Sequence, residues 1–184
     1  MRRITGSLFQ SLDGVIQAPG GPEEDQTGFR HGGWTFPYFD GALDGPMGRL
    51  LGGDYELLLG RRTYEIFAAY WPHNGDQPIG ATFNAVRKHV VTSSDRALDW
   101  TNSQRLAGDP VAAVTRLKDS DGPDLLIQGS SLLYPALLPA GLIDRIVPGE
   151  ALMDTALALC AGVIAAKPGH AEAIGRMVRV AARG

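Results

Sequence analysis

The sequence predicts an α/β domain built on a mainly parallel sheet. Segments with the apolar runs of buried strands alternate along the chain with segments whose apolar residues recur at helical spacing. Three strand candidates are short apolar runs, each followed by glycine or serine: ELLL at 56–59, KHVVT at 88–92 and LLIQ at 125–128. The 184 residues, 44% of them apolar and 20% charged, suit one globular domain with a small appendage.

The expected strands are identified by their composition and by the residues that end them. The first candidate, ITGSLFQSL, is rich in strand formers and stops at Asp13-Gly14, a turn pair. The last candidate is followed by Pro148, which cannot donate to a sheet ladder. The expected strands cover residues 4–12, 56–59, 88–92, 125–128 and 142–147.

The expected helices show an apolar stripe or a start signal. Tyr64, Phe67 and Ala68 follow the i, i+3, i+4 pattern of one helix face. Asp109 and Pro110 mark a helix start, because aspartate caps the first turn and proline is tolerated at the first helical position. The expected helices cover residues 40–52, 61–69, a segment beginning at 110, and 130–138.

Residues 17–37 read as a long loop rich in glycine and proline. A loop of more than about 15 residues is uncommon in a compact domain and often serves as a lid or binding loop. The loop ends in a cluster of aromatic residues that begins with Trp34 and Phe36, and such side chains are seldom left in water. This stretch is therefore a candidate wall of a binding site, and its acidic run 23–25 is expected to be a solvated cluster.

Composition excludes several functional classes. The net charge of −3 argues against a nucleic-acid-binding domain, and the longest apolar run, residues 156–166, is too short to span a bilayer. The single cysteine, Cys160, cannot form an internal disulfide, and no signal-type apolar region follows the first residues, so we expect a cytoplasmic protein. The four histidines are scattered, and no metal site is expected.

Three strand ends share residues suited to binding an anion. Gly60-Arg61-Arg62-Thr63, Thr92-Ser93-Ser94 and Gly129-Ser130-Ser131 each follow a predicted buried strand. The N–H groups at a helix start carry partial positive charge, and glycine permits close approach of the backbone. The dinucleotide fingerprint G-x-G-x-x-G and the P-loop are both absent. A ligand that touched all three strand ends would carry several phosphates.

An ordered set of motifs resembles the dihydrofolate reductase superfamily, and within it the branch named for the C-terminal reductase domain of the bifunctional riboflavin-biosynthesis enzyme. The resemblance covers roughly residues 3–147. It rests on SLDGVI at 11–16, LLGRRTYE at 58–65, KHVVTSS at 88–94, LIQGSS at 126–131 and GLID at 141–144. It implies a three-layer α/β/α fold with a mainly parallel mixed sheet, and a reductase that uses NADPH.

The resemblance also assigns roles at the strand ends. It places Gly60, Arg61, Arg62 and Thr63 at the cofactor phosphates and Ser93 and Ser94 at the ribose that carries the 2′-phosphate. It places Gly129, Ser130 and Ser131 around the pyrophosphate. In the bound state NADPH would supply hydride, while the protein orients it and excludes water.

The substrate side is implied by the same resemblance. Asp13 and Ile16 would face the nicotinamide and substrate, together with Trp34 and Phe36. Reduction also needs a proton, for which Asp13 and Asp40 are the candidates. The implied substrate is a small heterocycle such as the phosphoribosylamino-pyrimidine of riboflavin synthesis. The alternatives are a dihydrofolate-type reductase and a nucleotide-binding module without turnover.

The resemblance ends near Pro148. Residues 1–148 are expected to form the reductase domain, and residues 149–184 are an alanine-rich segment whose pattern favours two helices in place of the closing strands of the family. The resemblance implies a homodimer, whose interface this departure would alter.

Overall fold

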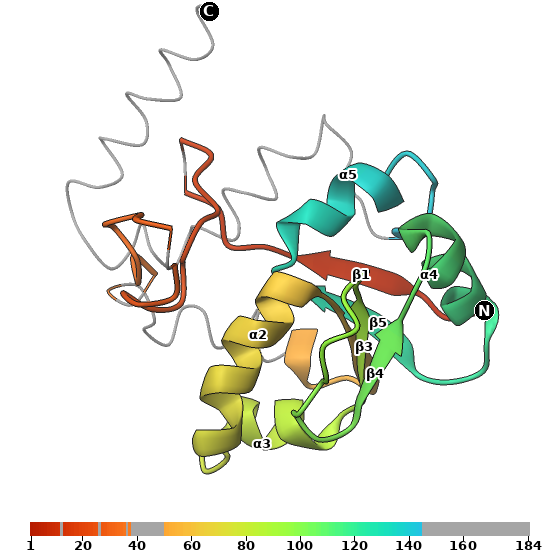
Figure 1. Ribbon diagram of the computed structural model, residues 1–184, viewed down its shortest axis with the longest axis horizontal. Coiled ribbons are helices and arrows are strands. Elements are labelled where there is room, and N and C mark those ends of the chain that lie inside the picture. Colours follow the sequence, from red (N-terminus) through yellow and green to blue (C-terminus); the bar gives the residue numbers. More distant parts are fainter. Residues whose placement is uncertain (12, 26, 36, 38–49, 145–184) are drawn as a thin grey trace, which may run out of the picture. The chain divides into compact units, whose positions relative to one another are not determined.

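The computed structural model describes residues 1–11, 13–25, 27–35, 37 and 50–144 (Figure 1). Residues 1–35 and 52–144 among these belong to one compact unit. Its strands form a single sheet in the order β1-β5-β2-β3-β4, and every described pairing is parallel. The strands are β1 (Ile4–Ser7), β2 (Tyr55–Gly60), β3 (Lys88–Val91), β4 (Ser103–Leu106) and β5 (Asp124–Gln128). The predicted α/β class is confirmed.

The helices lie on both faces of the sheet. The connection from β2 to β3 moves along the sheet toward the β4 edge, and the connection from β4 to β5 moves in the opposite direction, toward β1. Because crossovers between parallel strands are right-handed, opposite directions place their helices on opposite faces. Figure 1 shows α2 and α3 apart from α4 and α5 in this way. The helical segments are α2 (Arg61–Tyr70), η2 (Trp71–His73), α3 (Pro78–Ala85), α4 (Pro110–Asp119), η3 (Ser131–Leu133) and α5 (Tyr134–Leu137).

Each face of the sheet has its own apolar contacts. On one face, side chains of the central strands pack with Val114 of α4 and Leu137 of α5 in one buried cluster. On the other, Phe67, Trp71 and Phe83 contact one another through their rings. Neighbouring strand residues point to opposite faces, so the complete burial of 57–59 in β2 shows that helices cover both.

The start of α4 follows the sequence prediction. The Asp109 carboxylate accepts a hydrogen bond from the Ala112 backbone N–H at 2.8 Å, and Pro110 occupies the first turn. This bond satisfies one of the amide groups that a helix start leaves without a partner.

Two expected strands are corrected. The strand expected at 4–12 ends at Ser7, because its partner β5 ends at Gln128 and the chain then turns at Gly129. The segment expected as a strand at 142–147 is not a strand over 142–144. There the Asp144 N–H donates to the Ile4 carbonyl at 3.0 Å, but the Ile4 N–H donates to the Asp144 carboxylate at 2.7 Å rather than to a backbone carbonyl.

Two elements were not predicted. The strand β4 has the sequence SQRL, which lacks apolar alternation because, among the described strands, it lies at the edge of the sheet and pairs with β3 alone. The helix α3 is short and begins at Pro78. The predicted helix at 40–52 lies outside the described residues except at its end, and the alanine-rich segment 149–184 lies wholly outside them. In the described part of the chain, no helix is long and apolar enough to cross a bilayer.

Candidate functional site

The strand ends singled out in the sequence lie at one edge of the sheet. Because the described strands run parallel, β2, β3 and β5 all end there, and the chain leaves each of them at Gly60, Val91 and Gln128 (Figure 1). Ligands of open α/β sheets bind outside the carboxyl ends of the strands. The three predicted anion-binding turns are therefore neighbours in space.

The turns after β2 and β5 are joined by hydrogen bonds. The Gly60 N–H donates to the Ser130 hydroxyl at 3.0 Å, and the Ser130 N–H donates to the Thr63 hydroxyl at 3.1 Å. The Gly129 N–H donates to the carbonyl of Ser7 at 2.9 Å, which adds the end of β1. Three of the residues predicted from the resemblance, Gly60, Thr63 and Ser130, thus form one hydrogen-bonded group. Each serine or threonine hydroxyl here accepts a bond and keeps its own proton free to donate.

The turn after β5 has an uncommon backbone conformation. Gly129 has a φ of 67°, and Ser130 follows with a φ of 52° and a ψ of 44°, both in the left-handed region. A Cβ at position 129 would lie 3.4 Å from the Thr63 methyl carbon, so glycine also allows the two turns to approach closely. A non-glycine residue such as Ser130 keeps this conformation only when its surroundings hold it there. Its two hydrogen bonds to the β2 turn do so.

The helix α2 begins at this edge and supplies unsatisfied donors. Its N-cap is Gly60, which has no side chain to cap the first turn, and the first turn contains no acidic residue. The N–H groups of Arg61, Arg62 and Thr63 therefore stay available, and the helix dipole makes the place favourable for an anion.

Arg61 links α2 to the 92–97 turn, which follows β3. Its guanidinium donates to the carbonyls of Arg96 and Ala97 at 3.0 and 3.4 Å, and to the Glu65 carboxylate at 2.8 Å. These bonds use three of the five N–H donors of a guanidinium. Arg61 thus holds the turn against the helix and keeps two donors for a ligand.

Two further arginines lie at the 92–97 turn. Arg105 of β4 donates to the Ser93 carbonyl at 3.1 Å, and Arg96 lies 3.6 Å from the Glu65 carboxylate. The Ser94 hydroxyl accepts from the Arg96 N–H at 3.2 Å, and Ser93 is exposed. The Glu65 carboxylate thus lies between the guanidinium groups of Arg61 and Arg96, whereas Arg105 contacts the backbone of the turn. The turn itself also carries one carboxylate, that of Asp95.

Sequence reasoning missed Arg105. It lies on β4, an unpredicted strand, and its register opposite Val90 brings it close to the turn after β3. Arginine in an exposed polar segment is common, so only the strand pairing could have indicated this residue.

The predicted catalytic aspartate, Asp13, lies on an exposed turn. Its carboxylate accepts a hydrogen bond from the Ser11 hydroxyl, which in turn accepts from the Val15 N–H at 2.9 Å. Gly14 has a φ of 89°, as a tight turn requires. The other predicted carboxylate, Asp40, and the predicted substrate residue Phe36 lie outside the described residues.

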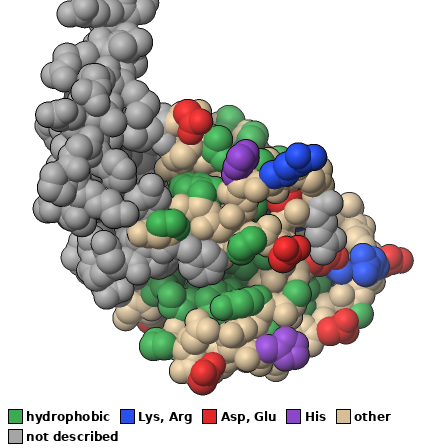
Figure 2. Space-filling view, turned by 90° about the vertical axis from the view of Figure 1, so that its left-hand side faces the viewer, with side chains coloured by type: hydrophobic (Ala, Val, Ile, Leu, Met, Phe, Trp, Pro, Cys, Tyr) green, Lys and Arg blue, Asp and Glu red, His purple; other side chains and the backbone are tan. Residues whose placement is uncertain are grey.

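The remaining predicted substrate residues belong to the two ends of the long loop. Ile16 is 36% exposed, an unusual setting for isoleucine, and the Trp34 indole N–H donates to the carbonyl of the adjacent Gln17 at 2.9 Å. The face of the molecule in Figure 2 carries apolar side chains among dispersed acidic, basic and histidine side chains. The loop therefore presents apolar surface that a heterocycle could contact.

Arg62 has a different partner from Arg61. Its guanidinium lies 2.5 Å from a carboxylate oxygen of Asp25, a residue of the long loop. The acidic run at 23–25 is thus not a fully solvated cluster as expected, because Asp25 is buried.

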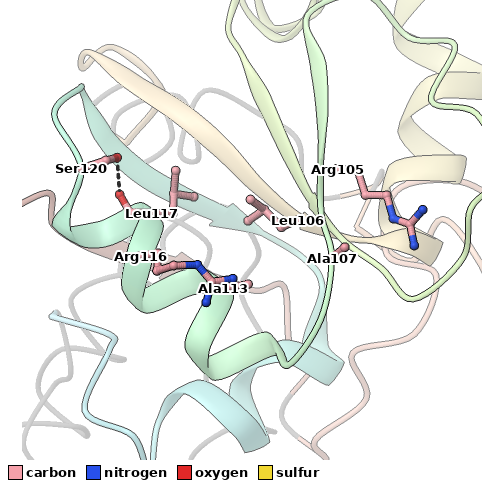
Figure 3. Close-up of a pocket in the computed structure, with 7 residues that line it drawn as sticks. All are labelled: Arg105, Leu106, Ala107, Ala113, Arg116, Leu117 and Ser120. Carbon is pink, nitrogen blue, oxygen red and sulfur yellow. Dashed lines mark hydrogen bonds between the residues drawn. The ribbon is translucent and has the colours of Figure 1, made fainter.

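A shallow cavity of about 300 Å³ lies elsewhere, between β4 and α4 (Figure 3). Leu106 and Leu117 line it together with Arg105, whose side chain points away from α4. None of the residues predicted from the sequence to form the site lines this cavity. The strand-end turns are a candidate site outside this cavity.

Comparison with known families gives one match. The family model described as the RibD C-terminal domain matches residues 2–148. No curated protein matches the chain.

Proposed function

Because this chain belongs to the RibD C-terminal domain family, whose members are reductases of the riboflavin-biosynthesis type, we propose that it is an NADPH-dependent reductase. The substrate we propose is a small heterocycle, similar to the phosphoribosylamino-pyrimidine of riboflavin synthesis. The observation that carries the proposal is the hydrogen-bonded meeting of the turns after β2 and β5 beside the uncapped start of α2.

The described residues fit the phosphates of such a cofactor. Gly129 provides a position where no Cβ intervenes, and the hydroxyls of Thr63 and Ser130 can each donate one proton. Together with the first amides of α2, Arg62 and Ser131, they would hold the pyrophosphate. Backbone N–H groups at a helix start bind phosphate without further charge.

The 92–97 turn would hold the 2′-phosphate that distinguishes NADPH from NADH. The hydroxyls of Ser93 and Ser94 belong to the turn that Arg61 and Arg105 contact. Guanidinium groups bind phosphate oxygens with charge-assisted bonds, which are about twice as strong as neutral ones. The arginines favour the cofactor with the additional dianionic group.

The chemistry divides between cofactor and chain. In the bound state, NADPH supplies hydride to a C=N or C=O group of the substrate. Ile16 and Trp34 would cover the reacting face and exclude water from it. The substrate also gains a proton, and Asp13 is the described carboxyl group for which we propose this role.

A fluorescence titration with NADPH and NADH tests the proposal. We expect NADPH to bind more tightly, and the preference to fall about tenfold in Arg61→Ala, since one charge-assisted contact is lost. Absence of binding by either nucleotide below millimolar concentration would overturn the proposal.

A nucleotide-binding module without turnover is the second candidate. One observation favours it: the residues that we propose to hold the phosphates are all described, whereas the proposed proton donor Asp13 is exposed and bonded to Ser11. Oxidation of NADPH with pteridine, pyrimidine or quinone acceptors separates the two. Turnover with any of them supports the reductase, and tight binding without oxidation supports the module.

A further inference from the structure

We propose that Asp25 is a positioning residue that docks the 17–35 loop on the start of α2 and holds the Arg62 guanidinium beside the phosphate-binding turn. The cofactor part of this inference rests on the proposed function. The docking part does not, because it concerns a contact between two described segments of the chain.

Several residues of the 17–35 loop donate hydrogen bonds to the carboxylate of Asp25. Its side chain is only 1% exposed, and its carboxylate accepts from the Thr27 N–H at 3.0 Å and the Thr27 hydroxyl at 2.8 Å. The Phe29 N–H at 3.3 Å and the Gln17 side-chain amide at 2.5 Å complete the set. A buried carboxylate with this many donors stays ionised and fixes the groups around it.

The bonds at Asp25 extend to both ends of the loop. Gln17 bonds Asp25 through its side chain and accepts from the Trp34 indole N–H through its carbonyl. Next to it, the Gly33 N–H donates to the Ala18 carbonyl at 2.9 Å. Loss of the Asp25 carboxylate is therefore expected to alter the position of Trp34, which we place at the substrate.

The contact with Asp25 fixes the Arg62 guanidinium but occupies only part of it. One guanidinium nitrogen lies 2.5 Å from Asp25, while 57% of the side chain stays exposed. The remaining N–H donors of Arg62 thus face solvent at the start of α2, next to the unsatisfied amides. An isolated exposed ion pair contributes little. This pair differs because one partner is buried and already fixed by four other hydrogen bonds.

Limited digestion with trypsin tests the docking. Arg30 is exposed within the loop, so cleavage after it reports loop opening, and mass spectrometry identifies the cut. We expect Asp25→Asn and Arg62→Ala each to raise the cleavage rate at Arg30 about tenfold, as expected for loss of one charge-assisted contact. The control is Glu23→Gln, which removes an exposed carboxylate two residues away. Equal rates in wild type and Arg62→Ala would overturn the docking role.

A double-mutant cycle on NADPH affinity tests the positioning. We expect Arg62→Ala to weaken binding about tenfold, and Asp25→Asn several-fold. If Asp25 acts through Arg62, adding Asp25→Asn to Arg62→Ala causes no further loss. A merely structural role of Asp25 within the loop predicts additive losses, and that outcome would overturn the positioning role.

The two proposals fail in different ways. A wild-type chain that binds neither NADPH nor NADH overturns the proposed function and the positioning role together. The docking role is then decided by the tryptic cleavage rates alone. Should Asp25→Asn fail to fold, Arg62→Ala still decides the docking role, because it leaves the hydrogen bonds within the loop in place.

Discussion

The hydroxyl oxygen of Ser130 accepts the backbone N–H of Gly60 at 3.0 Å, across a separation of 70 residues in sequence. This bond ties the turn after β5 to the turn after β2, where the two strands end side by side. It also holds Ser130 in a left-handed conformation that serine seldom adopts. The geometry of the candidate phosphate site thus depends on one side chain.

Ser130→Ala is expected to lower the free energy of unfolding by about 1–3 kcal/mol. The substitution leaves the Gly60 N–H without its acceptor, and alanine tolerates a φ of 52° poorly. Ser130→Gly removes the same hydroxyl but suits the backbone, so it should lose less stability than Ser130→Ala. Urea denaturation of the three proteins gives the comparison. Equal stability of Ser130→Ala and wild type would contradict the role assigned to the bond.

Arg105→Gln is expected to reduce the NADPH over NADH preference about three- to tenfold. Arg105 contacts the Ser93 carbonyl in the 92–97 turn, and its loss removes positive charge where we place the 2′-phosphate. Arg116→Gln is the matched control, because it removes an arginine of α4, and the Arg105 side chain points away from α4 (Figure 3). Fluorescence titrations with both nucleotides measure the ratio, and an equal loss in the two variants would argue against a local effect.

The free energy of unfolding is expected to increase as the pH rises above 8, because buried Lys88 loses its proton in the folded chain before it does so in the unfolded chain. Its side chain is fully buried, and its ammonium donates to the carbonyls of Asn84 and Thr101 at 3.0 Å. Burial lowers the pKa of Lys88 from 10.5 to about 8. Between these two values the unfolded chain binds more protons than the folded one, so the free energy of unfolding increases with pH. The gain is about 1–2 kcal/mol between pH 8 and about 9.5.

Lys88→Met should abolish this increase. Guanidinium denaturation followed by circular dichroism at several pH values below 10 measures it. Higher pH is avoided because burial raises the pKa of Tyr55 and Tyr134 to about 12, and stability that depends on their protonation is lost as the pH rises above 10. A similar pH dependence in Lys88→Met and wild type would contradict the assignment to Lys88.

Gly6→Ala is expected to destabilise the fold by about 1–3 kcal/mol. A Cβ at Gly6 in β1 would lie 2.6 Å from a ring carbon of Tyr134 in α5, so the Tyr134 ring would have to shift. Gly53→Ala is the control, because a Cβ there meets no atom within 4 Å. Thermal unfolding of both variants measures the difference. If the two melt alike, the close packing of β1 against α5 is not what requires glycine.

The sequence by itself determined the elements that carry local signals. The buried runs that became β2, β3 and β5 are apolar enough to be recognised alone, and Asp109 caps α4 by a bond within its own first turn. The order of the motifs also determined the family, and with it the set of candidate cofactor residues.

Only the tertiary structure decided which distant groups meet. Residues Ser103–Leu106 form β4 because they pair with β3. Strand β1 ends at Ser7 because its partner β5 does not continue beyond Gln128. The pairing of Asp25 with Arg62 and the approach of Arg105 to Ser93 likewise join segments that lie apart in sequence. Periodicity and capping act over a few residues and can be predicted from local sequence. Strand pairing and ion pairs depend on which backbone the folded chain brings within reach, and local sequence does not encode that.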